Sequence, residues 1–242
     1  MRLSAGRGGI EVEDAVAALA AYRCPELEAF REPGETPALH LRRSPPLAEG
    51  EPLGTAGGYT VDGDGVRVWM PEEPLAAEAA LRLAFAVAFQ RQGGLLLHAV
   101  GICFPGGAWL GVGPSGCGKS TLAQRCADAG AEVLSDETVG WLPDGTLWPT
   151  PFRSSARFTW RARPEPRPLS MLAFLEHGRL ERVDPLSPAE VVKRLLAQVY
   201  RIPGAGGLDA VATLIALAEP VRFMFRDDPA AAAFVRRALG RE

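Results

Sequence analysis

The segment Gly113-Pro-Ser-Gly-Cys-Gly-Lys-Ser-Thr121 constrains the fold of this 242-residue chain more than any other feature. It satisfies the pattern G-x-x-x-x-G-K-[ST], read from Gly113 to Ser120. A strand is predicted before it, over residues 108–112, and a helix after it, over residues 119–128. The glycines let the backbone between them curl so that successive N–H groups point inward. A loop of this kind at a helix N-terminus is suited to hold a diphosphate.

The composition draws attention to the lysine of this loop. Of the 26 basic residues, only Lys119 and Lys193 are lysines, and Lys193 is expected to be a solvated helix position. Lys119 can reach the β- and γ-phosphates of a nucleotide, and the Ser120 hydroxyl can ligate Mg²⁺. Cys117 is interpreted as a small side chain of the loop. The candidate nucleotide-binding residues are Gly113, Pro114, Ser115, Gly116, Cys117, Gly118, Lys119, Ser120 and Thr121.

Two adjacent acids, Asp136 and Glu137, follow Lys119 by 17 and 18 residues. One helix and a tight turn occupy that distance, so the strand over residues 131–135 is predicted to lie beside the strand that enters the loop. Its carboxyl end would then face the phosphate site. One acid can accept a proton from an attacking hydroxyl while the other holds a metal ion. The alternative is a pair of solvated acids in a turn.

A histidine, His98, interrupts the apolar strand predicted over residues 95–104. In a strand, Leu96, His98 and Val100 share one face. An unpaired polar group on a buried face costs about 1–3 kcal/mol, so the imidazole requires a partner. Two interpretations stay open at this stage: a buried neutral histidine bonded to a backbone carbonyl, or a member of the site formed by the loop and the acids.

Helices and strands are also predicted in the rest of the chain. Apolar alternation between Tyr59 and Met70 predicts a β-hairpin. Residues 33–52, rich in proline, glycine and glutamate, are predicted to be loop, and residues 163–168 an extended basic loop. Further helices are predicted over residues 11–21, 71–93, 188–199, 208–218 and 229–239, and further strands over residues 138–142, 146–148, 157–160, 171–176 and 220–225. This mixture predicts an α/β fold with a mixed sheet.

Composition narrows the class of protein. Hydrophobic residues make up 47% and charged residues 23% of the chain, as in folded proteins. The net charge of −3 does not indicate a protein that binds nucleic acid over its whole surface. The most apolar stretch, residues 74–89, is too short to span a bilayer. The four cysteines lack metal-ligand spacing and are too few for a disulfide scaffold, and no signal peptide is evident. We therefore expect a cytoplasmic protein.

Three segments together resemble a known family: Leu97-His98-Ala99, the hairpin that leads into the glycine loop, and Leu134-Ser-Asp-Glu137. They are similar to the HPr kinase/phosphorylase family, and most of all to its HPr-kinase-like relatives, including those in peptide-modification gene clusters. The specific part covers residues 95–142, and a looser similarity covers residues 208–239. The resemblance implies a P-loop kinase domain of the HPr kinase C-terminal, phosphoenolpyruvate-carboxykinase-like type over residues 93–242. Residues 1–92 would form a smaller, partly loop-rich N-terminal α+β region.

The resemblance also assigns roles to residues. Asp136 matches the family's base for the serine hydroxyl, Glu137 matches the adjacent acid, and His98 matches a histidine close to that pair. The expected catalytic residues are thus Asp136, Lys119 and His98, the expected metal-binding residues are Ser120 and Glu137, and ATP and Mg²⁺ are the expected cofactors. The family's Glu-Ile-Arg-Gly segment, associated with the phosphorylase reaction, has no counterpart here.

Three functions remain open on the sequence. The leading one is an ATP-dependent kinase whose acceptor is a serine of a protein or precursor peptide. Such a kinase could form a homo-oligomer, as the family's founding members do. No nucleic-acid or membrane partner is expected. The second is a small-molecule kinase, although such chains usually begin near the loop and here 112 residues precede it. The third is a nucleotide-binding regulatory module with little turnover.

Overall fold

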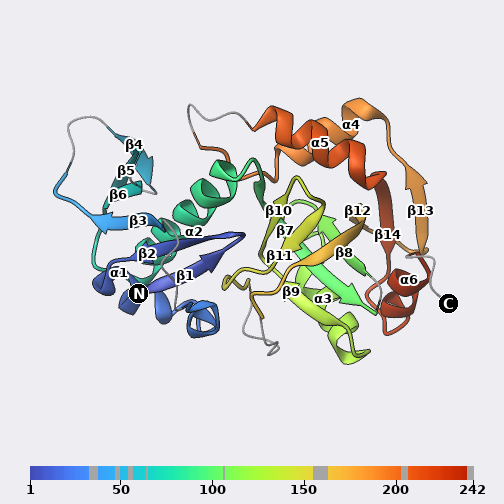
Figure 1. Ribbon diagram of the computed structural model, residues 1–242. Coiled ribbons are helices and arrows are strands. Elements are labelled where there is room, and N and C mark those ends of the chain that lie inside the picture. Colours follow the sequence, from blue (N-terminus) through green and yellow to red (C-terminus); the bar gives the residue numbers. More distant parts are fainter. Residues whose placement is uncertain are drawn as a thin grey trace.

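Two β-sheets organise the chain, one formed before residue 70 and the other after residue 94 (Figure 1). The computed structural model describes residues 1–32, 38–46, 50–53, 57–63, 65–105, 107–154, 163–202 and 207–238. Each sheet contains parallel and antiparallel pairs, and helices pack against both. The α/β class with mixed sheets, predicted from the sequence, is therefore confirmed.

The first sheet has the strand order β1-β2-β3-β6-β5-β4. Its strands are β1 (Arg2–Ala5), β2 (Gly8–Val12), β3 (Ala38–Arg43), β4 (Glu51–Leu53), β5 (Gly57–Val61) and β6 (Gly65–Trp69). A helix, α1 (Asp14–Ala21), and a 3₁₀ turn, η1 (Leu27–Phe30), accompany it. The antiparallel β5–β6 pair is the hairpin that the alternation between Tyr59 and Met70 predicted.

Two predictions for this region were wrong. The helix expected from residue 11 begins at Asp14, because Glu11 pairs with both β1 and β3 and Val12 pairs with β3. The tract over residues 33–52, expected to be loop, contains β3 and part of β4. Non-local pairing decides both cases, since β3 lies between two parallel neighbours that a local pattern does not reveal. Pro52 is accommodated because β4 lies at the edge of the sheet.

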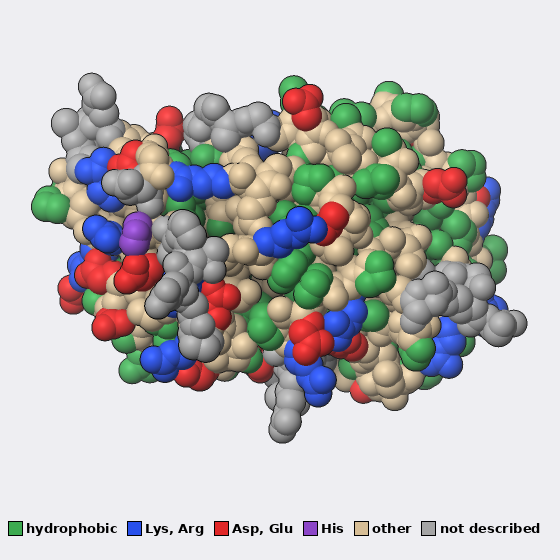
Figure 2. Space-filling model, viewed as in Figure 1, with side chains coloured by type: hydrophobic (Ala, Val, Ile, Leu, Met, Phe, Trp, Pro, Cys, Tyr) green, Lys and Arg blue, Asp and Glu red, His purple; other side chains and the backbone are tan. Residues whose placement is uncertain are grey.

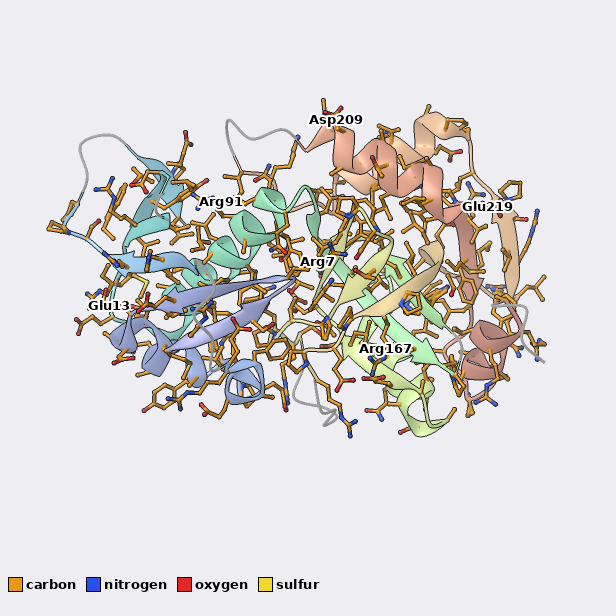
Figure 3. The ribbon with its side chains drawn as sticks, in the orientation of Figure 1. Arg7, Glu13, Arg91, Arg167, Asp209 and Glu219 are labelled. Atoms are coloured by element: carbon orange, nitrogen blue, oxygen red, sulfur yellow. The ribbon has the colours of Figure 1, made fainter. Side chains whose placement is uncertain are left out.

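The helix α2 (Pro74–Arg91) joins the two sheets. It is apolar on nearly all sides and contacts β2, β3 and β6 of the first sheet as well as β7 and β10 of the second. Its Pro74 occupies the first helical turn, where the missing N–H costs nothing. Figure 3 shows Arg7 at the same junction, where its guanidinium pairs with Asp144 in the turn after β10. One hydrophobic core consequently runs from the first sheet into the second.

The second sheet has the strand order β11-β10-β7-β8-β12-β14-β13, with β9 also paired to β7. Its strands are β7 (Leu95–Phe104), β8 (Gly107–Val112), β9 (Glu132–Ser135), β10 (Thr138–Leu142), β11 (Thr146–Trp148), β12 (Arg167–His177), β13 (Arg182–Pro185) and β14 (Val221–Phe225). β8, β12 and β14 run parallel, whereas β7 runs antiparallel to β8.

Helices cover both faces of this sheet (Figure 1). On one face, α3 (Lys119–Asp128) and α6 (Ala231–Ala238) belong to the same core as α2. On the other face, α4 (Pro188–Leu196) and α5 (Leu208–Ala218) pack over a second cluster. A capping box of Ser187 and Glu190 starts α4, and Gly130, at φ 84°, ends α3.

Several boundaries in the second sheet differ from those predicted. β9 lies beside β7 and not beside β8, so β7 separates the acid-bearing strand from the strand that enters the loop. The helix expected over residues 188–199 ends at Leu196, because the chain at 198–200 bonds to β7 instead. β12 begins at Arg167, inside the predicted basic loop, and β13 was not predicted. The strand predicted over residues 157–160 lies outside the described residues.

The surface carries both signs of charge. On the face that Figure 2 shows, acidic and basic side chains are interspersed. Ion pairs near the first sheet include Glu11–His40 and Asp62–Arg67. Leu208 and Leu217 of α5 are exposed. Among the described residues, no helix has the length and apolar character needed to cross a bilayer.

The contact between α2 and the second sheet gives a stability prediction. A Cβ added at Gly140 of β10 would lie 2.0 Å from Cζ of Phe89 on α2, so the Gly140→Ala variant must push the helix away from the sheet. We expect a loss of about 1–3 kcal/mol in the free energy of unfolding, measured by urea denaturation. Gly63→Ala, where a Cβ meets nothing within 4 Å, is the control, and an equal effect in both variants would contradict this packing.

Candidate functional site

The glycine loop leaves β8 at Gly113 and enters α3 at Lys119. Gly116 and Gly118 have φ angles of 82° and 95°, in the left-handed region that favours glycine. A Cβ at Gly118 would also lie 2.7 Å from Cζ of Phe225. The predicted strand and helix on either side of the loop are confirmed, and the helix has the predicted bounds.

The ammonium group of Lys119 is folded into this loop. Its Nζ donates to the carbonyl oxygens of Gly113, at 2.8 Å, and Pro114, at 3.2 Å, and only 6% of the residue is exposed. Burial lowers the pKa of this ammonium. Within the described part of the chain, no carboxylate lies at ion-pair distance from it, although the charges of Asp136 and Glu137 act on it from farther away and raise its pKa. A buried cation without a directly paired counter-ion is costly, so the loop has the character of a site that an anionic ligand completes.

The acid pair lies in a break between two strands. β9 and β10 follow one another along the same edge of β7, where Ser135 pairs with Gly101 and Thr138 pairs with His98. Asp136 and Glu137 occupy the break. Because β9 and β8 run in the same direction on either side of β7, both strands end at nearly the same level along β7, beside Gly101 and Ala99. The predicted meeting of acids and loop is therefore observed, although the strand order behind it was predicted wrongly.

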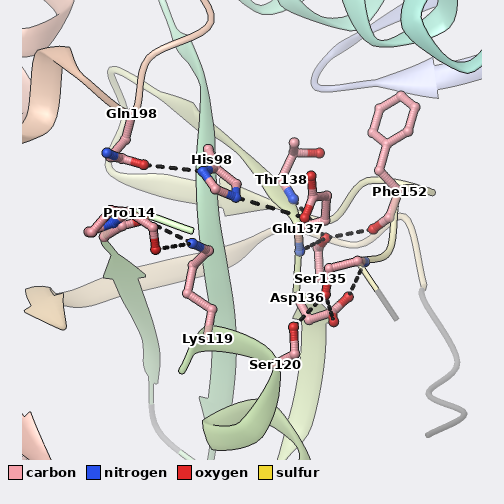
Figure 4. A network of polar contacts seen from close by, with 12 residues as sticks. His98, Pro114, Lys119, Ser120, Ser135, Asp136, Glu137, Thr138, Phe152 and Gln198 are labelled. Atoms are coloured by element: carbon pink, nitrogen blue, oxygen red, sulfur yellow. Dashed lines mark hydrogen bonds and ion pairs between the residues drawn. The ribbon is translucent and has the colours of Figure 1, made fainter. Parts of the chain in front are cut away.

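Ser135 fixes the shape of this break. Its Oγ accepts hydrogen bonds from the backbone N–H groups of Glu137, at 3.2 Å, and Thr138, at 3.1 Å. The same Oγ donates to the carbonyl oxygen of Phe152 at 2.8 Å (Figure 4). The turn is thus held from inside by a buried hydroxyl, and both carboxylates are presented in fixed directions.

Asp136 is fully buried, and Ser154 engages both of its carboxylate oxygens. The backbone N–H of Ser154 donates to Oδ1 at 3.1 Å, and its hydroxyl donates to Oδ2 at 2.5 Å. The Ser154 hydroxyl also contacts the hydroxyl of Ser120 at the start of α3. A chain of hydrogen bonds therefore connects Ser120 of the loop to Asp136 through the Ser154 hydroxyl. No local pattern indicates Ser154, because its contact with Asp136 spans 18 residues.

Glu137 is held on the other side of the break. Its Oε1 accepts from Nη1 of Arg82 at 2.9 Å, and its Oε2 lies 3.8 Å from Nε2 of His98. Arg82 belongs to α2, donates to the Tyr200 hydroxyl at 3.1 Å, and also pairs with Glu78. Sequence analysis missed Arg82 as a site residue. The available signal was the spacing of Glu78 and Arg82, four residues apart in an otherwise apolar helix.

His98 projects from β7 toward the same centre. Its Nδ1 is hydrogen-bonded to Oε1 of Gln198 at 3.1 Å, and its backbone N–H donates to the Gln198 carbonyl oxygen at 2.7 Å. Burial lowers the pKa of His98 below its ordinary value of 6.5, and the positive charge of Lys119 acts in the same direction. The structure thus places His98 beside the acid pair and gives its ring a side-chain partner (Figure 4).

Gln198 reaches His98 because α4 stops at Leu196. The residues that follow form an isolated bridge in which Val199 pairs with Leu97, and Tyr200 donates its N–H to the Leu96 carbonyl oxygen at 2.9 Å. The polar partner of His98 therefore comes from a stretch whose sequence favours helix. Lys193, by contrast, is exposed on α4, as predicted.

The side chains present suit a magnesium ion only together with phosphate. Within the described ranges, no three His, Cys, Asp or Glu side chains gather as a metal site. Of the two residues predicted to bind metal, Ser120 faces Asp136 through Ser154, whereas Glu137 contacts Arg82 and His98. Mg²⁺ is commonly bound by few protein oxygens, with phosphates and water completing its shell. The Ser120 hydroxyl at the mouth of the loop fits that pattern.

Comparison with known proteins adds no assignment. No family model matches the chain, and no curated protein matches it. The geometry of the loop, the acid pair and His98 is therefore the basis for assigning a function.

The lowered pKa of His98 gives a pH-dependence prediction. Because its pKa is lower in the folded than in the unfolded chain, the unfolded state gains its proton first as the pH falls. The stability linked to neutral His98 is fully present above pH 6.5 and is lost as the pH falls toward the lowered pKa. Relative to His98→Gln, the wild type should lose unfolding free energy as the pH falls below 6.5, measured by urea denaturation. A difference independent of pH would contradict this assignment.

Proposed function

We propose that this protein is a P-loop kinase of the HPr-kinase-like type, which transfers the γ-phosphoryl group of ATP to a serine hydroxyl of a protein or peptide. The observation that carries the proposal is the buried Lys119 ammonium, which lacks a carboxylate counter-ion in the described residues and lies within a loop of left-handed glycines. A polyphosphate supplies the missing charge. The serine acceptor rests on the resemblance over residues 95–142.

The loop and its helix account for binding of the donor. Backbone N–H groups of the loop and the N-terminus of α3 would hold a bound diphosphate, and Lys119 would balance negative charge on the transferring group. Ser120 is the residue best placed to hold Mg²⁺, with Glu137 as the second proposed metal-binding group. When bound, Mg²⁺ neutralises charge on the β- and γ-phosphate oxygens.

The acids account for activation of the acceptor. We assign Asp136 as the base, because its Oδ2 already accepts a hydrogen bond from a hydroxyl at 2.5 Å, the type of contact that base catalysis requires. Glu137, paired with Arg82, keeps a second negative charge next to it. His98, whose lowered pKa favours the neutral ring, lies against Glu137 and orients the pair without adding positive charge.

The role of Lys119 is tested by the Lys119→Ala variant. Loss of the ammonium should weaken binding of Mg·ADP at least about tenfold and abolish phosphoryl transfer, since the charge that meets the phosphates is removed. Unfolding free energy should change by less than about 1 kcal/mol, because alanine is a good helix former. Binding is measured by calorimetry. Arg125→Ala, which removes an equal charge from the exposed face of α3, is the control. Wild-type binding and turnover in Lys119→Ala would contradict the proposal.

The role of Asp136 is tested by Asp136→Asn. A base acts on the acceptor and not on the donor, so transfer should fall by about 10²–10⁴-fold while Mg·ADP affinity stays nearly unchanged. The measurement combines single-turnover kinetics with calorimetry. Equal loss of nucleotide affinity and of transfer would assign Asp136 to metal binding or to the fold.

A further inference from the structure

We propose that Ser154 is a phosphorylation site of the enzyme itself, and that each chain transfers a phosphoryl group to its own Ser154. This inference rests on the proposed kinase function and goes beyond it, because it names a residue of the chain as acceptor. Its basis is the position of one hydroxyl between the assigned base and the phosphate loop.

The first support is the contact with the base. A hydroxyl that is to be phosphorylated must lie within hydrogen-bond reach of the group that takes its proton. The Ser154 Oγ donates to Oδ2 of Asp136 at 2.5 Å, and the Ser154 N–H donates to Oδ1 at 3.1 Å. The serine is thereby held at two points, and its proton is already directed at Asp136.

The second support is the contact with the loop. The same Ser154 oxygen touches the hydroxyl of Ser120, which immediately follows the lysine of the loop. A nucleotide whose phosphates fill the loop would bring its γ-phosphoryl group to this end of α3. One oxygen atom therefore stands next to the base on one side and next to the donor's binding loop on the other.

The chain before Ser154 keeps the hydroxyl there. The Phe152 carbonyl oxygen accepts from Ser135, and the Phe152 ring packs edge-on against Phe85 of α2, with centroids 5.2 Å apart. Arg153 pairs with Glu26, which lies just before η1. These contacts fix the residues before Ser154 from both sheets, so the position of its hydroxyl is built into the fold.

The reaction balances with ATP as the only co-reactant. The Ser154 oxygen forms a bond to the γ-phosphorus, the bond from that phosphorus to the β-phosphate oxygen breaks with its electron pair leaving on ADP, and Asp136 takes the serine proton. The product carries about two negative charges beside the acid pair, which repels it. Since Ser154 engages both oxygens of buried Asp136, an external hydroxyl meets this base only after Ser154 has moved.

The test incubates the purified full chain with Mg²⁺ and γ-labelled ATP, without any added acceptor. We expect one phosphoryl group per chain, mapped to Ser154 by tandem mass spectrometry. The initial fraction labelled per unit time should not depend on protein concentration, because donor and acceptor lie in one chain. Ser154→Ala should lose the label while it binds Mg·ADP like the wild type, and Ser170→Ala, at an exposed serine of β12, should label like the wild type.

Four results would overturn the inference. An unlabelled Ser154 in a wild type that binds and consumes ATP in a Lys119-dependent manner removes Ser154 as acceptor and leaves the proposed kinase function intact. Absence of both label and nucleotide binding removes the two together. A labelling rate that rises with protein concentration excludes transfer within one chain, and undiminished labelling of Ser154→Ala excludes Ser154 as the acceptor.

Discussion

The burial of the Lys119 ammonium among carbonyl oxygens is the interaction on which the functional site depends. A cation taken from water without a carboxylate partner is unfavourable, and a chain tolerates that cost where a ligand's charge offsets it. The surrounding architecture holds the lysine in place: β8 enters the loop, α3 starts directly at Lys119, and Gly118 adopts a left-handed conformation against Phe225. We therefore propose that an anionic ligand binds at this loop and offsets the cost of burying the Lys119 ammonium.

Strand β7 positions the acid pair and His98 near this lysine. β8 occupies one of its edges, and β9 and β10 together occupy the other, so the break between them presents Asp136 and Glu137 toward the loop. His98 extends from β7 itself. Arg82 of α2 reaches Glu137 from outside the second sheet, which ties the first part of the chain to the site. The N-terminal region is thus connected to the acids by a direct ion pair as well as by a common core.

The sequence predicted those parts of the site that local patterns encode. The loop, the bounds of α3 and the strands β10 and β11 follow from glycines, apolar alternation and turn residues that are close in the chain. Three residues of the site were not predicted: Ser154, Gln198 and Arg82. Each contacts a partner that lies 18 to 100 residues away in the sequence. β3 and the early end of α4 were not predicted for the same reason, since pairing with distant strands overrode local preference.

The role of the glycine loop can be tested by a crystal structure with Mg²⁺ and a non-hydrolysable ATP analogue. We expect the β-phosphate to lie within the loop and the Lys119 ammonium to leave the carbonyl oxygens of Gly113 and Pro114 for phosphate oxygens. We also expect the Ser120 hydroxyl to ligate the metal ion. An analogue bound away from the loop, with Lys119 still bonded to both carbonyl oxygens, would contradict this role.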